Sequence, residues 1–324
     1  MITKREKIIW AVYGAALVLL FLASSTDLII KERENPVYPI SVVIEEDSDD
    51  QYVNFRKGMD QAAMELNADV SFITLYESSQ AEQQLEMLRR EKQDGAQALV
   101  VAPVDEGALE TALEAEPLEV PLILSNGDGL AEYTSAEVSV DIREMGRALG
   151  GEVAGRHGSG ERILLFENGE ETSVKGRFEE GLRESLSQAG FELVSVSGDR
   201  ENGFRNALES LCYPAEQDAV VIALDPDSLL ETAELLEESA RYRPYVKGVY
   251  GRGTSIPVLN ALDEGWITGL CVTDDFSAGY LCARLAVDGA RGTLKKTEIS
   301  LPFYYIEREA LREPRYEKML YPIE

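Results

Sequence analysis

Apolar residues along this chain occur alternately in short continuous runs and at helical spacing. Ile40 to Ile44 is a continuous apolar run rich in β-branched residues, which is typical of a buried strand. A polar loop from Glu45 to Asp50 follows, and apolar residues then recur at helical spacing from Tyr52 to Leu66. A strand that leads into a helix through a polar loop is half of a βαβ unit. Ligands gather at the carboxyl ends of such strands, so this loop is expected to form one wall of a binding site.

The same alternation continues through the chain. Further strands are predicted at 70–75, 98–102, 120–124, 138–140, 162–166, 192–196, 219–224, 246–250, 266–273 and 298–305. Helices are predicted at 80–92, 106–114, 143–156, 172–189, 204–211, 229–240, 256–263 and 276–288. Strands alternating with helices predict an α/β fold with parallel sheets and right-handed crossovers. Two such series meet near Val140 and Asp141, which indicates two similar lobes.

The amino-terminal segment differs from the rest. Lys4, Arg5 and Lys7 precede a run without charge from Ile8 to Thr26, close to the roughly 20 residues that cross a bilayer as a helix. Cations before the run predict a cytoplasmic amino terminus and an exported remainder. The small residues Ala23 and Ser25 would permit signal-peptide cleavage, but the length of the run favours an uncleaved transmembrane anchor. Residues 31–38, with Pro36, are interpreted as a short stalk, so residues 1–38 form the anchor and stalk.

Charge and rare residues exclude several classes of protein. Lys and Arg total 31 against 59 Asp and Glu, a net charge of −28, whereas binding to DNA or RNA needs a basic face. Cys212, Cys271 and Cys282 show no CxxC spacing, so neither a disulfide framework nor a zinc site is expected, although one pair could bridge. His157 is the one histidine, and no motif of a hydrolase or nucleotide-binding enzyme is present. We therefore expect no enzyme activity, no cofactor and no bound metal.

The acidic loop admits two interpretations. Clustered carboxylates at positions 45–50 suit a hard cation such as calcium, but the spacing of an EF-hand loop is missing. A solvated rim of the binding cleft is the favoured alternative.

Ordered landmarks across most of the chain resemble one family. They are Phe55-Arg56-Lys57-Gly58-Met59, Asp94-Gly95 before the strand at 98–101, Val120-Pro121-Leu122-Ile123 before Asn126, Val140-Asp141 with Gly146 and Gly150, Phe178-Glu179-Glu180-Gly181-Leu182, Gly248-Val249-Tyr250-Gly251, and Asp263-Glu264-Gly265. From about Pro39 to Tyr305 the chain resembles the type 1 periplasmic binding proteins, especially the ribose- and galactose-binding branch related to lactose-repressor effector domains.

This resemblance implies two doubly wound parallel-sheet lobes joined by hinge crossovers, with a small polar ligand, usually a sugar, enclosed between them. Lobe 1 is expected to comprise residues 39–140 plus 274–297, and lobe 2 residues 141–273 plus 298–324. The one transmembrane helix would precede both lobes.

The resemblance also implies a set of ligand-binding residues. By their family positions they are Asp50, Gln51, Tyr52, Asn126, Arg177, Asp225, Tyr250, Thr273 and Asp274. Tyr52 is expected to stack on a sugar face. Ala102, Gly176 and Tyr250 depart from the family pattern, so the ligand is expected to differ from ribose or galactose, or the cleft to have lost high affinity.

Two functions follow as hypotheses. In the first, a solute-binding protein anchored in the plasma membrane, with its lobes outside the cytoplasm, delivers a sugar to an ABC permease. In the second, a ligand-sensing accessory protein signals to a membrane receptor such as a histidine kinase. A transcriptional repressor with the same effector domain is excluded, because the amino terminus is a hydrophobic helix and not the helix-turn-helix domain that would bind DNA.

Overall fold

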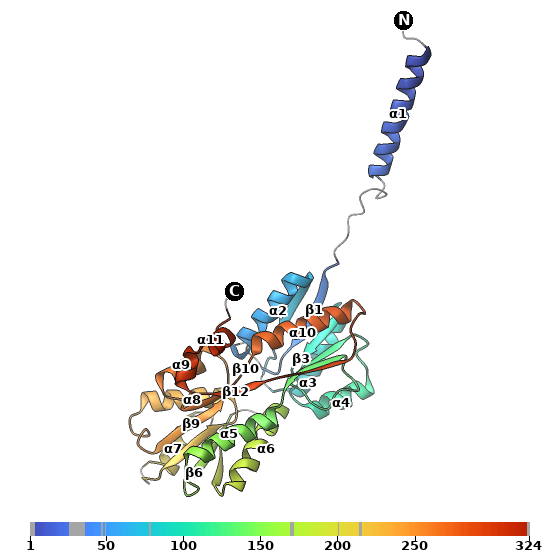
Figure 1. Ribbon diagram of the computed structural model, residues 1–324. Helices are drawn as coiled ribbons and strands as arrows, with labels where there is room; N and C mark the ends of the chain where they lie inside the picture. Colours follow the sequence, from blue (N-terminus) through green and yellow to red (C-terminus); the bar gives the residue numbers. More distant parts are fainter. Residues whose placement is uncertain are drawn as a thin grey trace. The chain divides into compact units, whose positions relative to one another are not determined.

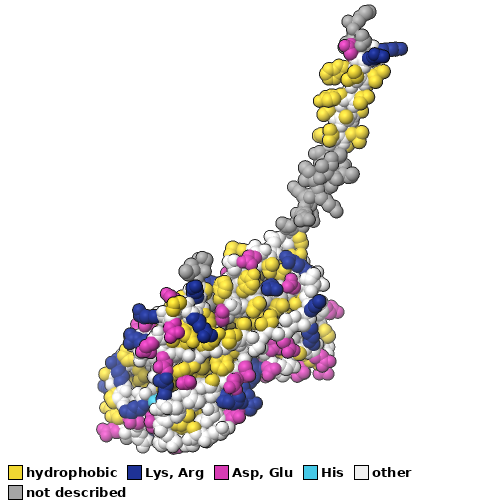
Figure 2. Space-filling view, in the orientation of Figure 1, with side chains coloured by type: hydrophobic (Ala, Val, Ile, Leu, Met, Phe, Trp, Pro, Cys, Tyr) yellow, Lys and Arg dark blue, Asp and Glu magenta, His cyan; other side chains and the backbone are white. Residues whose placement is uncertain are grey.

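The computed structural model describes residues 4–25, 36–46, 48, 50–77, 79–168, 172–199, 201–213 and 216–322. The chain forms two units, Met1–Val37 and Tyr38–Glu324, which are described separately. In the first unit, α1 (Lys4–Ser25) carries exposed apolar side chains from Ile8 to Leu22, visible in Figure 2. Within the described ranges, no helix is both long enough and apolar enough to cross a membrane.

The second unit contains two six-stranded sheets, one in each lobe (Figure 1). The first sheet has the order β11-β5-β4-β3-β1-β2 and all its pairings are parallel. Its strands are β1 (Tyr38–Val43), β2 (Ala68–Ile73), β3 (Ala98–Val101), β4 (Leu122–Ser125), β5 (Ala136–Val140) and β11 (Thr297–Leu301). The second sheet has the order β12-β10-β9-β8-β6-β7, with β12 antiparallel to β10. Its strands are β6 (Arg162–Glu167), β7 (Glu192–Ser197), β8 (Ala219–Ala223), β9 (Val246–Arg252), β10 (Gly269–Thr273) and β12 (Phe303–Ile306).

Helices cover both faces of each sheet, which confirms the predicted α/β architecture with two parallel-sheet lobes. Those of the first lobe are α2 (Val53–Leu66), α3 (Ala81–Gln93), α4 (Glu106–Ala115) and α10 (Asp275–Ala290). Those of the second are α5 (Ile142–Arg156), α6 (Ser173–Gln188), α7 (Arg205–Leu211), α8 (Pro226–Glu238) and α9 (Ile256–Glu264). Each sheet therefore has one core cluster on each face.

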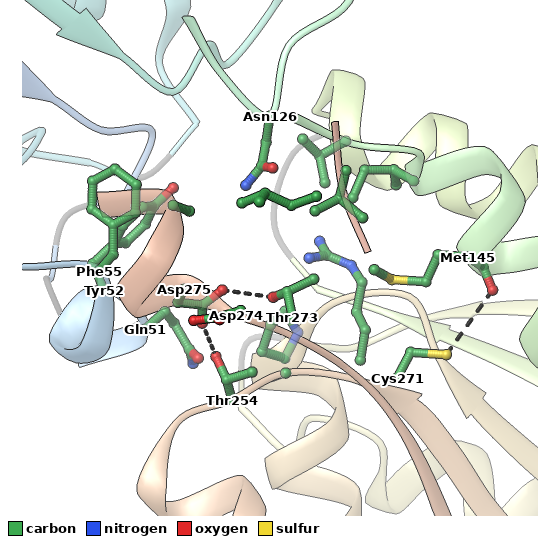
Figure 3. A pocket seen from close by; sticks show the side chains of 18 of the residues that line it. Gln51, Tyr52, Phe55, Asn126, Met145, Thr254, Cys271, Thr273, Asp274 and Asp275 are labelled. Carbon is green, nitrogen blue, oxygen red and sulfur yellow. Dashed lines mark hydrogen bonds between the residues drawn. The ribbon is translucent and has the colours of Figure 1, made fainter. Parts of the chain in front are cut away.

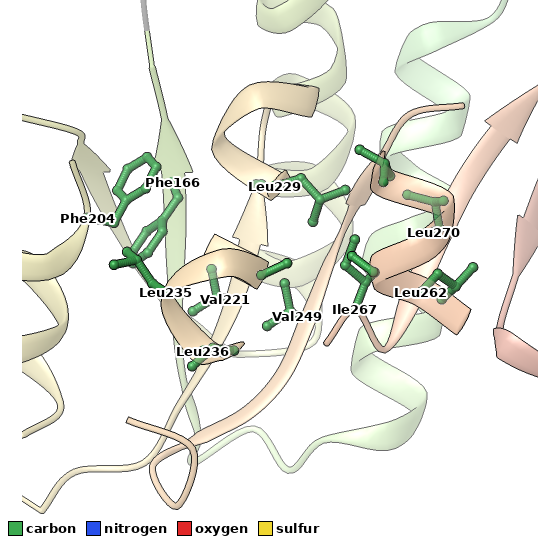
Figure 4. Packing of buried hydrophobic residues seen from close by; sticks show 14 of the residues in the cluster. Phe166, Phe204, Val221, Leu229, Leu235, Leu236, Val249, Leu262, Ile267 and Leu270 are labelled. Carbon is green, nitrogen blue, oxygen red and sulfur yellow. The ribbon is translucent and has the colours of Figure 1, made fainter. Parts of the chain in front are cut away.

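Figure 4 shows one of these clusters, on the face of the second sheet covered by α7, α8 and α9. Phe166 and Phe204 stack there with ring centroids 4.2 Å apart. Buried leucines such as Leu229 and Leu236 pack over Val221 and Val249. The carboxyl-terminal segments η2 (Arg308–Arg312) and α11 (Pro314–Leu320) add Leu311 and Leu320 to the same cluster. Cys212, Cys271 and Cys282 are buried and free.

The chain passes between the sheets three times: from β5 into α5, from β10 into α10, and from β11 into β12. The third passage corrects the prediction of a single final strand at 298–305. Pro302 divides that strand, because proline has no N–H to donate to a sheet, and its two halves join different sheets. The lobe boundaries given above remain a prediction. However, residues 298–301 of β11 fall in the range assigned to lobe 2, and β11 pairs with β5 of the first sheet.

Each lobe has one close helix crossing, α2 against α10 and α5 against α6. Glycines make both crossings possible. A Cβ at Gly58 would collide with the carbonyl oxygen of Phe276, and one at Gly181 would collide with that of Arg143. In each lobe, one of the two crossing helices enters from a passage between the sheets: α10 in the first lobe and α5 in the second. The other helix, α2 or α6, follows the first strand of the same lobe.

Candidate functional site

The carboxyl ends of the strands in both sheets border a cavity of about 120 Å³ (Figure 3). Its wall combines side chains of the first lobe, the second lobe and all three passages between them. Those of the first lobe include Glu45, Glu46, Gln51, Tyr52, Phe55 and Asn126. Those of the passages and the second lobe include Val140, Ile142, Met145, Val174, Arg252, Thr254, Thr273, Asp274, Asp275 and Leu301. We call this cavity the first chamber.

A second chamber of about 100 Å³ adjoins the first. The two share Glu45, Glu46, Gln51, Val174, Pro226 and Arg252. Side chains found only in the second chamber are mainly polar: Ser79, Asn168, Thr172, Lys175, Asp225 and Asp227. The cleft therefore has a mixed apolar and polar compartment beside a polar one.

Glu45 is the first polar residue after the buried run that ends at Ile44, so the strand carries it directly into the cleft. The Tyr52 hydroxyl donates a hydrogen bond of 2.5 Å to Oε2 of Glu45. Burial, reinforced by the neighbouring charge of Glu46, raises the pKa of Glu45 to about 7. Glu45 is partly buried and lines both chambers, so it belongs to the wall of the cleft and not to the solvated rim expected from the sequence. Of the other acids, Asp50 is exposed, and Asp47 and Asp49 lie outside the described residues.

Tyr52 lines the first chamber, as expected, but its ring also packs within the protein. It meets Phe55 edge to face, with ring centroids 5.6 Å apart, and Phe72 at 5.9 Å. Its hydroxyl is held by Glu45. Tyr52 therefore lines the chamber beside Phe55 as part of an aromatic cluster (Figure 3).

Three carboxylates at the carboxyl ends of strands are held by donors of the protein. Asp274 caps α10, accepting from the backbone N of Ser277 at 2.9 Å and from its Oγ at 2.7 Å. Asp275 accepts from Thr273 Oγ1 at 2.6 Å and from Thr254 Oγ1, as the dashed lines in Figure 3 show. Burial raises the pKa of Asp275.

Asp225, which the sequence analysis also selected, follows β8 and caps α8 at the wall of the second chamber. It accepts from Ser228 N at 2.7 Å, from Ser228 Oγ at 2.8 Å and from Asn168 N at 3.0 Å. Capping aspartates offset the partial positive charge at helix amino termini, which explains why several acids lie together at this edge.

Arg252 is the residue of the cleft that the sequence analysis missed. It ends β9 and lines both chambers, with its guanidinium carbon 5.7 Å from the centre of the Phe178 ring. Its Nε is buried and has no hydrogen-bond partner among the described residues. Burial lowers the pKa of its guanidinium, while the charges of Asp225 and Glu45 oppose that change. The sequence predicted this strand at 246–250, but β9 continues for two more residues and ends at Arg252. An arginine at the carboxyl end of a strand was the signal that could have identified it.

Tyr250, by contrast, lies in the core and lines neither chamber. Two residues span about 7 Å along a strand, so Tyr250 lies that far below the edge that Arg252 reaches. It is 1% exposed, and its hydroxyl is 2.9 Å from Nε2 of His157 at the end of α5. The structure therefore does not support its placement in the ligand site.

Arg177 connects the lobes instead of lining a chamber. From α6 it donates to Oε1 of Glu106 at 2.5 Å and to the carbonyl oxygen of Asn126 at 2.7 Å. Asn126 itself lines the first chamber, in a left-handed conformation with φ of 55°. Gln51 adds a second contact between lobes, donating from Nε2 to Asp227 Oδ1 at 3.1 Å. With these bonds made, the lobes are closed around the chambers.

Of the predicted site residues, the structure brings together Gln51, Tyr52, Asn126, Thr273 and Asp274 around the first chamber, and places Asp225 at the second. Whether they contact a ligand remains a prediction. Among the described residues, no group of three or more His, Cys, Asp or Glu side chains is arranged to hold a metal ion.

Residues 40–294 match the family described as periplasmic binding protein domain. Among curated proteins, none matches the sequence. Solved structures with the same fold include an ABC transporter solute-binding protein from Agrobacterium vitis bound with α-D-tagatopyranose. It has 18% identity and a TM-score of 0.75, with 88% of this chain and 100% of that chain covered. Another is a solute-binding protein from Bacillus halodurans with bound myo-inositol, at 20% identity and a TM-score of 0.73, covering 88% and 99%.

A third is a glucose-galactose binding protein from Geobacillus stearothermophilus, at 16% identity and a TM-score of 0.72, with 86% and 100% of the two chains covered. At these identities the structural likeness concerns the fold alone. The family match spans most of the chain and names binding, not catalysis. The chain therefore belongs to the family of periplasmic binding proteins, the type 1 fold that its sequence landmarks resemble.

Proposed function

We propose that this protein is an extracytoplasmic solute-binding protein that closes on a small sugar and delivers it to an ABC-type permease. The carrying observation is the first chamber, which both lobes enclose and in which apolar side chains lie beside several fixed polar groups. Sugars need such groups for their hydroxyls and an apolar surface for their C–H faces. Solute-binding proteins of the same fold are described with bound tagatose and inositol, which supports the ligand class.

The proposed ligand contacts are the chamber residues Gln51, Tyr52, Asn126, Thr273 and Asp274, with Asp225 beside them in the second chamber. The three passages between the sheets would serve as the hinge. Opening would separate Arg177 from Glu106 and Gln51 from Asp227. These contacts join side chains at the cleft edge, so they can break without disturbing either core.

A thermal-shift screen of the full chain, purified in detergent, over monosaccharides, disaccharides and inositols tests this proposal. A ligand at 100 times its Kd stabilises the folded state by about 2.7 kcal/mol, which raises the unfolding temperature by several degrees. The Asn126→Gly variant removes the amide but keeps the backbone free to adopt positive φ, so about threefold to tenfold weaker binding is expected. Asn206→Ala, at an exposed position of α7 whose side chain donates to Asp199, is the control. If no sugar stabilises the protein, the proposal fails.

Attachment to the plasma membrane by residues 1–38 is the second part of the proposal. Its support is the uncharged run from Ile8 to Thr26 behind the cations Lys4, Arg5 and Lys7, together with the exposed apolar side chains of α1. Carbonate extraction of membranes, followed by the mass of the protein, tests it. A protein released by carbonate, or one shortened near Ala23, would contradict an uncleaved anchor.

Signalling to a membrane receptor such as a histidine kinase is the alternative use of the same cleft. An uncleaved helix would favour it, because a tethered binding domain can report its closure to a neighbouring receptor. Crosslinking in membranes distinguishes the two: a permease as the ligand-dependent partner supports uptake, and a kinase supports sensing.

A further inference from the structure

Four of the carboxylates that line the cleft already have hydrogen-bond donors within the protein. Asp225 accepts three hydrogen bonds, and Asp274 accepts two from Ser277. Asp275 accepts from two threonine hydroxyls, and Glu45 from Tyr52. The positive ends of α8 and α10 further offset the charges of their capping aspartates. These four carboxylates therefore need few hydrogen-bond donors or positive charges from a ligand.

Arg252 is in the opposite situation. No described carboxylate oxygen lies within 4.0 Å of its nitrogens, and its buried Nε lacks an acceptor. The ring of Phe178 lies near the guanidinium, 5.7 Å from its central carbon. A buried charged donor without an acceptor is costly, and such groups are unusual in native proteins unless they have a functional use. The cleft therefore contains a fixed cation that needs an acceptor.

We infer that Arg252 selects a sugar acid: a monosaccharide whose carboxylate lies against this guanidinium. The inference rests on the proposed function and specifies its ligand. A carboxylate matches the planar fork of a guanidinium with two parallel hydrogen bonds, which a single hydroxyl cannot do. The first chamber, at about 120 Å³, has room for roughly ten water-sized groups, which is the scale of one sugar ring.

Among the described lining residues, Arg252 is the cation that borders both chambers. Lys175, which is 3% exposed, lines the second chamber alone and lies 3.7 Å from Oε2 of Glu167. Glu45, which follows β1 and lines both chambers, has a pKa of about 7 and therefore carries less than a full negative charge at neutral pH. A bound carboxylate would supply the acceptor that the described residues do not give to Arg252.

The test measures binding of D-galacturonate, D-glucuronate and D-gluconate to the full chain in detergent, each against its neutral counterpart D-galactose or D-glucose, at pH 7.5. At least one acid should bind about tenfold or more tightly than its neutral counterpart. Arg252→Gln should weaken that acid by about tenfold or more and change neutral-sugar affinity less. Arg252→Lys, which keeps the charge but loses the fork, should fall between. Arg89→Gln, an exposed arginine paired with Glu116 on the surface, is the control.

Ligand-free Arg252→Gln should unfold at the same temperature as the wild type or higher, because it removes an unpartnered buried charge. If that variant fails to fold, the affinities of Arg252→Lys and of the wild type for acidic and neutral sugars still test the inference. Neutral sugars that bind as tightly as the acids, or acid affinity that Arg252→Gln leaves unchanged, would overturn the inference and leave the proposed function standing. Failure of every sugar, acidic and neutral, would overturn both.

Discussion

The hydroxyl of Tyr52 lies 2.5 Å from Oε2 of Glu45, so an aromatic residue and an acid from the same loop are joined inside the cleft. The bond holds Glu45 in a partly buried position, where desolvation and the charge of Glu46 raise its pKa to about 7. It also orients Tyr52 against Phe55. The loop after the first strand is therefore a structured wall of the cleft, and its Glu45 side chain is partly protonated at neutral pH.

Stability should fall as the pH rises from about 4.5 to 7. The pKa of Glu45 is raised from 4.5 to about 7 in the folded state, so the protonated form favours folding and its contribution is lost above pH 7. This shift in the pKa of Glu45 corresponds to a loss of roughly 3 kcal/mol in the free energy of unfolding. Urea unfolding at pH 5 and pH 7.5 measures it. Glu45→Gln should remove most of this pH dependence, whereas Glu110→Gln, on the exposed face of α4, should keep it. Equal pH dependence in both variants would contradict the assignment.

Replacing Tyr52 by Phe should destabilise the protein more at pH 8 than at pH 5. At pH 8 the lost hydrogen bond goes to a charged acceptor and is worth about 1.5–3 kcal/mol, whereas at pH 5 Glu45 is protonated and the loss is about 0.5–1.5 kcal/mol. Chemical unfolding at the two pH values checks the difference. The same loss at both values would mean that Glu45 does not change its charge in this range.

Removing the contact between Arg177 and Glu106 should favour an open form. Arg177 is the residue that joins α6 to both Glu106 and the Asn126 carbonyl across the lobes. Arg177→Ala should increase the radius of gyration measured by small-angle scattering and accelerate ligand release severalfold. Arg143→Ala is the control, since its partners Glu180 and Glu184 belong to the same lobe. If both variants scatter like the wild type, the contact does not hold the lobes together.

A methyl group at Gly181 should destabilise the second lobe strongly. Its Cβ would collide with the Arg143 carbonyl oxygen, so α5 and α6 would have to separate, at a cost of about 3 kcal/mol or more. Gly155→Ala in α5 meets no atom within 4 Å and should stabilise the protein by about 0.5–1 kcal/mol, because alanine favours helices. Thermal unfolding of the two variants gives the comparison. A mild effect of Gly181→Ala would show that the crossing can relax.

The fold was predictable because strand and helix periodicities are local and the landmarks keep their order along the chain. The exchange of strands between sheets at Pro302 was harder to see. Periodicity shows that residues near 298–305 are extended, but the pairing partner of each half depends on contacts with distant strands, β5 and β10. Proline in the middle of the run was the available sign.

The site was less predictable, for two physical reasons. A shift of two residues along a strand keeps the same face but moves a side chain about 7 Å, which separates Arg252 at the cleft from Tyr250 in the core. Burial of an acid is the second reason. Glu45 and Asp50 look alike in the sequence, yet one lines the chambers and the other is exposed, because tertiary packing decides which is covered.

The passage of the chain into α10 and β11 has a consequence for synthesis. The core beneath α2 contains Ile40 and Phe55 from the start of the chain, but also Cys282 and Ala286 from α10. The ribosome therefore releases the beginning of the first lobe long before the helix that completes its core exists. The second lobe in turn lacks β12 and the core residues Leu311 and Leu320 until residues 303–320 have been made. Neither lobe can therefore complete its core until this late part of the chain has been synthesised.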